Sequence, residues 1–274
     1  MKKYIYLVVL LLSVGFFSSC SDLLDEKAQS QVDKNKFMNS ASEAETVLLG
    51  VYRSMVSDNL YGYNLSLLFS LSTDIAQCEG SSTSSFRQIP TNAFTTSNSS
   101  VQGTWEDLYT GIYNANDFLE TIATRYDSFS AKDKQLATIY MAEARTLRAL
   151  YYFELLRWYG NIVLMTSTEQ SYLQPSTFVQ AAPDSVYKYI ESDLKFAIEN
   201  LPYASDDNIR SDNSFRISRG AALGLLTKVY ATWAGYPVHD TSKWENAAQT
   251  AKILIDSGKH SLLPNYQTLW ENTC

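Results

Sequence analysis

The sequence has few of the residues on which most catalytic and metal sites depend. Its 274 residues include two histidines, His239 and His260, and three cysteines, Cys20, Cys78 and Cys274. The cysteines form neither a ligand cluster nor an obvious disulfide framework. Both histidines follow turn residues, so we expect them in solvated turns rather than beside a nucleophile or a metal. Since the sequence also has no phosphate-binding glycine loop and no carboxylate pair that stands out, we expect no enzyme, metal or cofactor.

Positive charge is also scarce. The chain has 22 Lys and Arg against 29 Asp and Glu, which gives a net charge of -7. Nucleic-acid binding needs clustered basic residues, so this composition argues against it. Hydrophobic residues make up 45% of the chain, and the 19 tyrosines and five tryptophans supply rings suited to cores and binding surfaces. The composition therefore indicates a packed globular protein.

The N-terminus has the pattern of a secretory signal. Lys2 and Lys3 precede an apolar run from Tyr4 to Phe17, and small residues lead to Cys20. The run is too short to span a membrane. A cysteine after small residues resembles a bacterial lipoprotein signal, although Phe17 replaces the usual aliphatic residue; the alternative is an ordinary signal peptide. We expect residues 1–19 to be removed, Cys20 to be lipidated and residues 20–39 to form a tether.

The stretch from Lys134 to Leu164 predicts the central helix. Apolar residues recur at helical spacing along two lines, so we expect this helix to be packed on two sides. One line contains Tyr140, Ala144, Leu147, Tyr151 and Trp158, and the other contains Ile139, Ala142, Ala149, Phe153 and Leu156.

Capping residues and periodic apolar patterns predict the other helices. We expect these after Ser40, from about 101 to 126, from Pro183 to Leu201, from Arg216 to Ala234, and from Ser242 to Gly258, where Ser242 and Glu245 have the spacing of a capping box. Residues 59–100 show no sustained period and predict a long irregular segment. The sequence thus predicts an all-α, tetratricopeptide-like scaffold of helical hairpins with long irregular loops, in one domain over residues 40–274.

The central stretch also resembles a known family. Glu143-Ala144-Arg145, the run from Leu147 to Phe153, and then Leu155, Arg157 and Gly160 are similar to the central helix of the SusD/RagB lipoproteins of Bacteroidetes. Further similar pieces are Pro183–Pro202, Arg219–Ala231 and Trp244–Leu262, whereas Val163 departs from the usual proline. Since the family continues well past Asn265-Tyr266, we expect its C-terminal half to be missing here.

The resemblance implies a function at the cell surface. Members are outer-membrane lipoproteins that face the exterior and bind oligosaccharides for import through a SusC-like TonB-dependent transporter, and the acidic stretch from Asp22 to Glu26 fits the surface delivery of such proteins. Two alternatives are a helical scaffold that binds only the transporter and a binder of other nutrients such as peptides. A third, a surface hydrolase, lacks any acid and base constellation in the sequence.

The segment from Thr73 to Ser100 is the candidate ligand site. Sugar rings stack on aromatic side chains, and their hydroxyls pair with carboxylates, amides and guanidinium groups. This segment supplies that mixture in Asp74, Gln77, Glu79, Phe86, Arg87, Asn92 and Phe94. The resemblance itself implies a ligand role only for Asp74, in the family's Thr-Asp motif. The alternative is a variable surface loop with a phenylalanine packed into the core; Trp105, on the helical pattern, is expected in the core, and Cys78 as a lone thiol.

Overall fold

A computed structural model describes residues 37–268, except residues 72, 77–80, 82 and 211–214. The expected signal peptide, Cys20 and most of the tether lie outside these described residues, as do Gln77, Cys78, Glu79 and Cys274. The helices belong to a unit that begins at Met38.

The described residues are helical, as the sequence predicts. The helices are α2 (Ala41–Met55), α3 (Asn64–Leu71), α4 (Ser85–Gln88), α5 (Ser99–Arg125), α6 (Ala131–Tyr159), α7 (Pro183–Asn200), α8 (Arg219–Ala234) and α9 (Lys243–Asp256). Within the described part of the chain, the only β pairing is an isolated antiparallel bridge between Val163 and Gln180. The predicted all-α, tetratricopeptide-like fold is confirmed.

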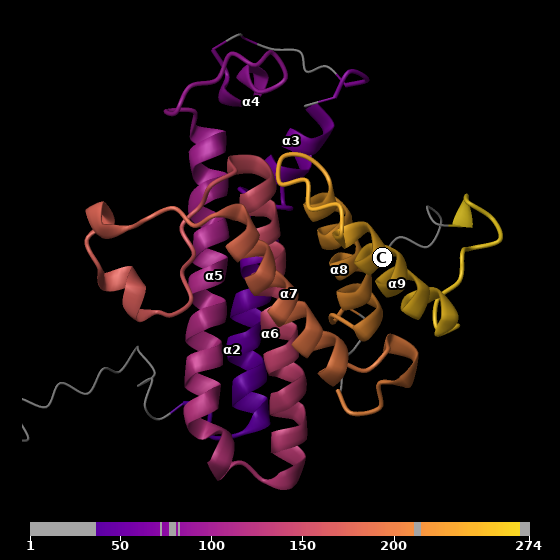
Figure 1. Cartoon of the computed structure of the whole chain (residues 1–274). Coiled ribbons are helices and arrows are strands. Elements are labelled where there is room, and N and C mark those ends of the chain that lie inside the picture. Colours follow the sequence, from indigo (N-terminus) through magenta and orange to yellow (C-terminus); the bar gives the residue numbers. More distant parts are fainter. Residues whose placement is uncertain (1–36, 72, 77–80, 82, 211–214, 269–274) are drawn as a thin grey trace, which may run out of the picture. The chain divides into compact units, whose positions relative to one another are not determined.

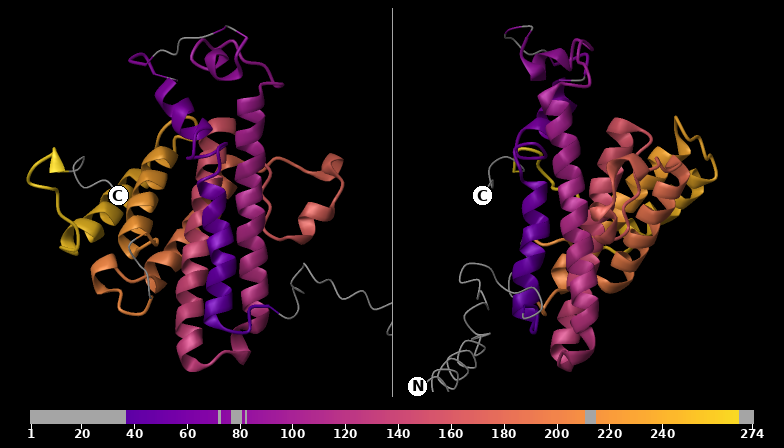
Figure 2. Two further views of the ribbon diagram at one scale, coloured as in Figure 1. Left: turned by 180° about the vertical axis from the view of Figure 1, so that it is seen from behind. Right: turned by 90° about the vertical axis from the view of Figure 1, so that its left-hand side faces the viewer.

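The helices pack mainly against their neighbours in the sequence. α5 and α6 form an antiparallel hairpin, and α2 lies against both (Figure 1). α7 packs on α6, α8 on α7, and α9 on α8, as Figure 2 also shows from two other sides. Short α4 lies beyond the N-terminal end of α5, and α3 lies beside the first turns of α5. The long hairpin therefore carries an irregular segment at that end.

The central helix α6 is packed on two sides, as predicted. Nine of the ten apolar residues in its two lines are buried, and the tenth, Trp158, is half-buried. The Ser130 hydroxyl caps the helix by accepting from the Asp133 backbone N–H at 3.2 Å, and Gly160 ends it with φ 71°. Burial extends beyond the apolar lines, because Glu143, Arg148 and Glu154 on the same helix are also buried.

Buried Glu143 is the centre of an ionic cluster that joins distant segments. Its carboxylate accepts from the Arg216 guanidinium at 2.7 and 2.9 Å and lies 3.1 Å from the Arg210 guanidinium. Tyr52 of α2 donates a hydrogen bond to the same carboxylate. Burial alone would lower the pKa of Arg216, but its hydrogen bonds and charge pairing with Glu143 outweigh burial and raise that pKa. One carboxylate thus holds α2, α6 and the segment before α8 together.

Two local predictions are wrong. Residues 59–100 are not wholly irregular, because Asn64–Leu71 forms α3 and Ser85–Gln88 forms α4. The α3 run NLSLLFSL is apolar on several sides, so it gives no clear helical period. The Ser242 hydroxyl does not cap α9; it donates to the Asp240 carboxylate at 2.6 Å instead.

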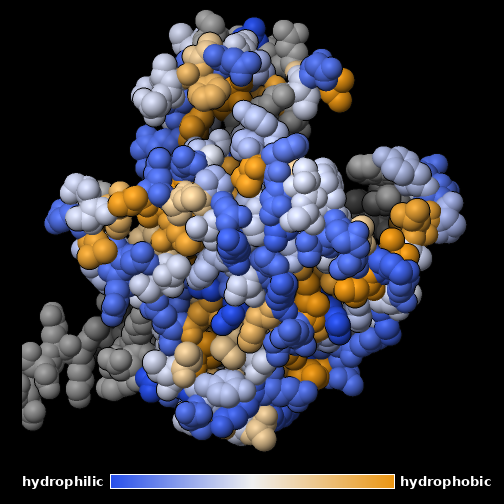
Figure 3. All heavy atoms as spheres, viewed as in Figure 1, coloured by the Kyte–Doolittle hydropathy of each residue, from blue (hydrophilic) through white to orange (hydrophobic). Residues whose placement is uncertain are grey.

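On the face shown in Figure 3, hydrophobic side chains form several separate patches among hydrophilic ones. Of the helices described, none combines the length and the apolar composition needed to cross a membrane.

Candidate functional site

Asn98 anchors the predicted ligand segment to the start of α5. It caps the helix, since its side-chain oxygen accepts from the backbone N–H groups of Ser100 at 3.1 Å and Val101 at 3.2 Å. Its amide nitrogen donates to the Ser85 carbonyl at 2.8 Å and to the Gln88 side chain at 3.0 Å. Because Asn98 is 4% exposed, this link is shielded from water. The buried amide thus fastens both ends of α4 to a rigid helix.

The predicted site residues fall into two groups. Phe86 and Arg87 lie on α4 and are half-buried. Asn92 is exposed in the following turn with φ 52°, and Phe94 is 45% exposed. Asp74 is exposed on the other side of residues 77–80, and within the described residues its carboxylate has no hydrogen-bond or ion-pair partner. Four of the five residues therefore share one anchored loop, while Asp74 belongs to a separate piece of chain.

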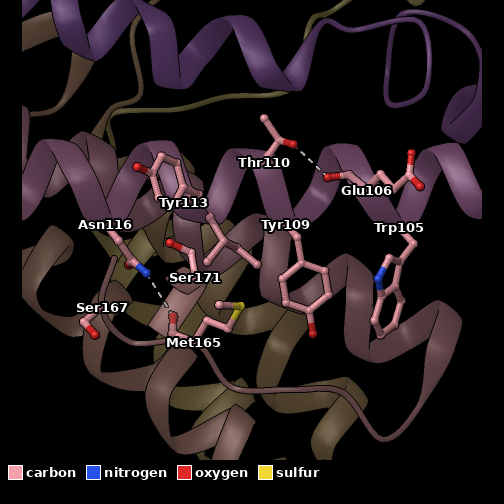
Figure 4. Close-up of a pocket in the computed structure, with 10 residues that line it drawn as sticks. Trp105, Glu106, Tyr109, Thr110, Tyr113, Asn116, Met165, Ser167 and Ser171 are labelled. Atoms are coloured by element: carbon pink, nitrogen blue, oxygen red, sulfur yellow. Dashed lines mark hydrogen bonds between the residues drawn. The ribbon is translucent and has the colours of Figure 1, made fainter. Parts of the chain in front are cut away.

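A second feature is a pocket between α5 and the segment that follows α6. Its volume is about 430 Å³, and its walls are mainly aromatic and aliphatic (Figure 4). The aromatic residues come from successive turns of α5. The lining residues are Trp105, Glu106, Tyr109, Thr110, Ile112, Tyr113, Asn116, Met165, Ser167 and Ser171.

Tyrosine hydroxyl groups fix the backbone on the far side of this pocket. The Tyr109 hydroxyl donates to the Val163 carbonyl at 2.8 Å and accepts from the Val163 N–H at 3.0 Å. The Tyr152 hydroxyl makes the same pair of bonds with Met165, at 2.6 and 2.9 Å. Burial raises the pKa of Tyr109 to about 12, against the opposing effect of its bond to the Val163 backbone. Each neutral tyrosine hydroxyl therefore satisfies the N–H and the carbonyl of one backbone residue, as a neighbouring β-strand would.

A buried chain of polar groups orients Asn116, which lines the pocket. Arg148 of α6 holds the Asp193 carboxylate with two hydrogen bonds of 2.8 Å and donates to the side-chain oxygen Oδ1 of Asn116 at 2.7 Å. This leaves the Asn116 amide nitrogen to donate to the Met165 carbonyl at 3.0 Å. The arginine thus fixes which way the Asn116 amide points.

The prediction that Trp105 lies in the core is wrong. Its ring is half-buried, lines the pocket, and packs against Tyr109 and Tyr159 with ring centroids 4.9 and 5.0 Å away. Sequence reasoning missed the pocket, although Trp105, Tyr109 and Tyr113 recur every four residues on α5. That spacing predicts a shared face, and only the position of the segment after α6 shows that the face is partly open.

The histidines lie where the sequence predicts. His239, with φ 61°, and His260 are both exposed. Among the residues that the structure describes, no group of three or more His, Cys, Asp and Glu side chains could hold a metal ion. The two features described above have the chemistry of binding surfaces, with aromatic faces beside amide, hydroxyl and charged groups.

The comparisons with known proteins agree with a binding role. Residues 22–231 match a family of SusD-like proteins described as "Starch-binding associating with outer membrane". A SusD-like protein from Bacteroides ovatus is 26% identical over 97% of this chain and 46% of its own length. The chain therefore spans about half the length of this relative.

Solved structures show the same pattern of coverage. The chain is similar to a SusD homologue from Bacteroides thetaiotaomicron, with 60% identity and a TM-score of 0.86 over 91% of this chain and 46% of the other. It is also similar to a laminarin-binding SusD-like protein, with 29% identity and a TM-score of 0.65 over 84% of this chain and 48% of the other.

Proposed function

Because the chain belongs to the SusD-like family of starch-binding, outer-membrane-associated proteins, we propose that it binds oligosaccharides at the cell surface for import through a SusC-like TonB-dependent transporter. It binds the glycan and hands it over, without cleaving it. The proposed glycan contacts are Asp74, Phe86, Arg87, Asn92 and Phe94.

The anchored loop at the start of α5 is the observation that supports this proposal best. It presents Phe86 and Phe94 as faces for sugar rings, and Arg87 and Asn92 as groups for hydroxyls. The buried Asn98 holds both ends of α4, so little conformational freedom remains to be lost when a ligand binds.

We expect Phe86→Ala and Asp74→Ala to weaken glycan binding. Loss of a stacking ring removes about 1 kcal/mol, which corresponds to about fivefold in Kd. Loss of a carboxylate that accepts from a sugar hydroxyl removes about 1.5–3 kcal/mol. Isothermal titration calorimetry of the purified chain against starch and laminarin oligosaccharides measures both effects.

Trp244→Ala is the matched control, because Trp244 is an aromatic residue that is 53% exposed on α9, away from the loop. It should leave the affinity unchanged. Absence of binding to every glycan in a broad array would defeat the sugar assignment, and unchanged affinity in both loop variants would remove these residues from the site.

We also propose that lipid on Cys20 anchors the protein to the outer membrane, facing the exterior. Cys20→Ala should move the protein from the membrane fraction to the soluble fraction and abolish labelling by a fatty-acid analogue, because the chain would lose its acyl chains. Cys78→Ala, which leaves the N-terminal pattern intact, is the control. Continued labelling of the Cys20→Ala protein would contradict the anchor.

Two alternatives stay within the same family. A scaffold that binds only the transporter should co-purify with it, and deletion of residues 83–97 should leave nutrient uptake unchanged. A binder of peptides or other nutrients should bind no glycan. Its binding of the other nutrient should be weakened by the same loop variants, Phe86→Ala and Asp74→Ala.

A further inference from the structure

The pocket beside α5 is separate from the loop that carries the proposed glycan contacts. None of the described residues between 73 and 97 lines the pocket. Trp105, its nearest lining residue to Asn98 along α5, lies seven residues further on, or about 10 Å along the helix axis. It therefore offers a second place where a ligand can bind.

Three aromatic rings on one side of α5 form most of one wall. Trp105, Tyr109 and Tyr113 follow one another at intervals of four residues, about 6 Å along the axis, which places them on the same face of the helix. Figure 4 shows Trp105 and Tyr109 extending toward the segment that carries Met165. Aromatic faces of this kind stack on the C–H face of a sugar ring.

The opposite wall is already in place before a ligand arrives. Tyr109 and Tyr152 fix Val163 and Met165 by paired hydrogen bonds, and Asn116 donates to Met165 as well. These polar groups make hydrogen bonds within the protein, so they fix the shape of the pocket. A preformed pocket loses little conformational freedom on binding.

The polar groups left for a ligand lie at the rim. Within the described residues, the Trp105 indole N–H has no hydrogen-bond acceptor, and the Ser167 hydroxyl has no partner. Glu106 uses one carboxylate oxygen to accept from Gln102 at 2.7 Å and is exposed. An aromatic wall bordered by a donor, a hydroxyl and a carboxylate suits a ring with several hydroxyls.

The negative charge at the pocket indicates that its ligand is not an anion. Among its lining residues, Glu106 is the one that carries a charge at neutral pH, and Asp107 is its neighbour in the chain. Within the part of the chain that the structure describes, no lysine or arginine lines the pocket. An anionic ligand would therefore be repelled there, whereas an uncharged one would not.

We propose that this pocket is a second glycan site, which binds one ring of an uncharged oligosaccharide through Trp105, Tyr113 and Glu106. The ligand class rests on the proposed function, but the location does not depend on the loop residues.

Calorimetry with a neutral oligosaccharide that the wild-type chain binds tests the location. We expect two sites per chain. Tyr113→Ala should weaken one of them at least tenfold and leave the other intact, Phe86→Ala should have the opposite effect, and Trp244→Ala should change neither. Circular dichroism and thermal unfolding should be the same for all four proteins, since Tyr113 is 37% exposed and Trp244 is 53% exposed.

A single site that Tyr113→Ala does not affect would overturn the second site and leave the proposed function standing. A single site weakened by both Tyr113→Ala and Phe86→Ala would also overturn it, because one ligand would then span both places. If the wild-type chain binds no glycan, the proposed function itself fails; binding of a phenyl compound at Tyr113 in that case would assign the pocket to a non-sugar ligand.

Glu106→Gln tests the charge. The wild-type pocket should discriminate at least tenfold against an oligosaccharide whose terminal ring is a uronate. Glu106→Gln should reduce that discrimination, and it should also weaken binding of the neutral ligand to a smaller extent, because the amide oxygen still accepts from a sugar hydroxyl but carries no charge. Equal affinity of the wild-type pocket for both ligands would contradict the inference.

Discussion

Replacing Leu147 with aspartate should unfold the helical unit. Leu147 is fully buried in α6, between helices on two sides. Removal of a buried leucine side chain costs about 2–5 kcal/mol, and burial of an unpaired polar group costs at least about 1–3 kcal/mol more. That sum is comparable with the whole stability of a typical protein, about 5–15 kcal/mol. Loss of the helical circular dichroism signal and rapid proteolysis should report it.

Leu49→Asp is the matched control, because Leu49 lies on α2 and is 51% exposed. It should keep the wild-type melting temperature. Ala149→Glu, at another fully buried position of α6, should behave as Leu147→Asp does. A native melting temperature for either buried variant would contradict the packing of α6 on two sides.

The second large effect is expected at Glu143. Glu143→Ala should lower the free energy of unfolding by about 3–5 kcal/mol, the usual loss when one partner of a buried ion pair is removed. The variant would leave the buried guanidinium groups of Arg210 and Arg216 without their shared carboxylate and Tyr52 without its acceptor. Urea unfolding followed by circular dichroism measures the change.

Glu199→Ala serves as the control, since Glu199 is exposed on α7. Its effect should stay within about 0.5 kcal/mol, as for other surface substitutions. If Glu143→Ala lost less than about 1 kcal/mol, the Glu143 cluster would not be what joins α2 to the segment before α8.

The sequence predicts α6 well because periodic apolar residues report burial directly. The two lines of the pattern correspond to the two packed sides, and Ser130 and Gly160 mark the ends. The partners of buried charged residues, by contrast, could not be predicted from the sequence. Glu143 finds its partners 67 and 73 residues later in the chain, at Arg210 and Arg216, and no local pattern links such distant positions.

The two candidate sites also differ in whether their residues are close together in the sequence. The loop could be predicted from composition, because Phe86, Arg87, Asn92 and Phe94 are close in the sequence and lie outside any long helix. The pocket could not, because its second wall comes from Met165 and Ser167, about 40 residues beyond the end of α5. The wrong prediction for Trp105 has the same cause, since helical spacing shows which face of a helix a residue is on but not whether that face is fully covered.

The bridge between Val163 and Gln180 has a consequence for how such a protein can evolve. The bridge and the hydrogen bond from the Ala181 N–H to the Ile162 carbonyl, at 2.8 Å, close the base of a loop. Once a loop is closed at its base, doubling its length costs only about 0.6 kcal/mol. Insertions and deletions between Thr166 and Val179 should therefore leave the helices intact. Ser167 and Ser171 of this loop line the pocket. The residues at the rim of the pocket can therefore change during evolution without a change in the helical scaffold.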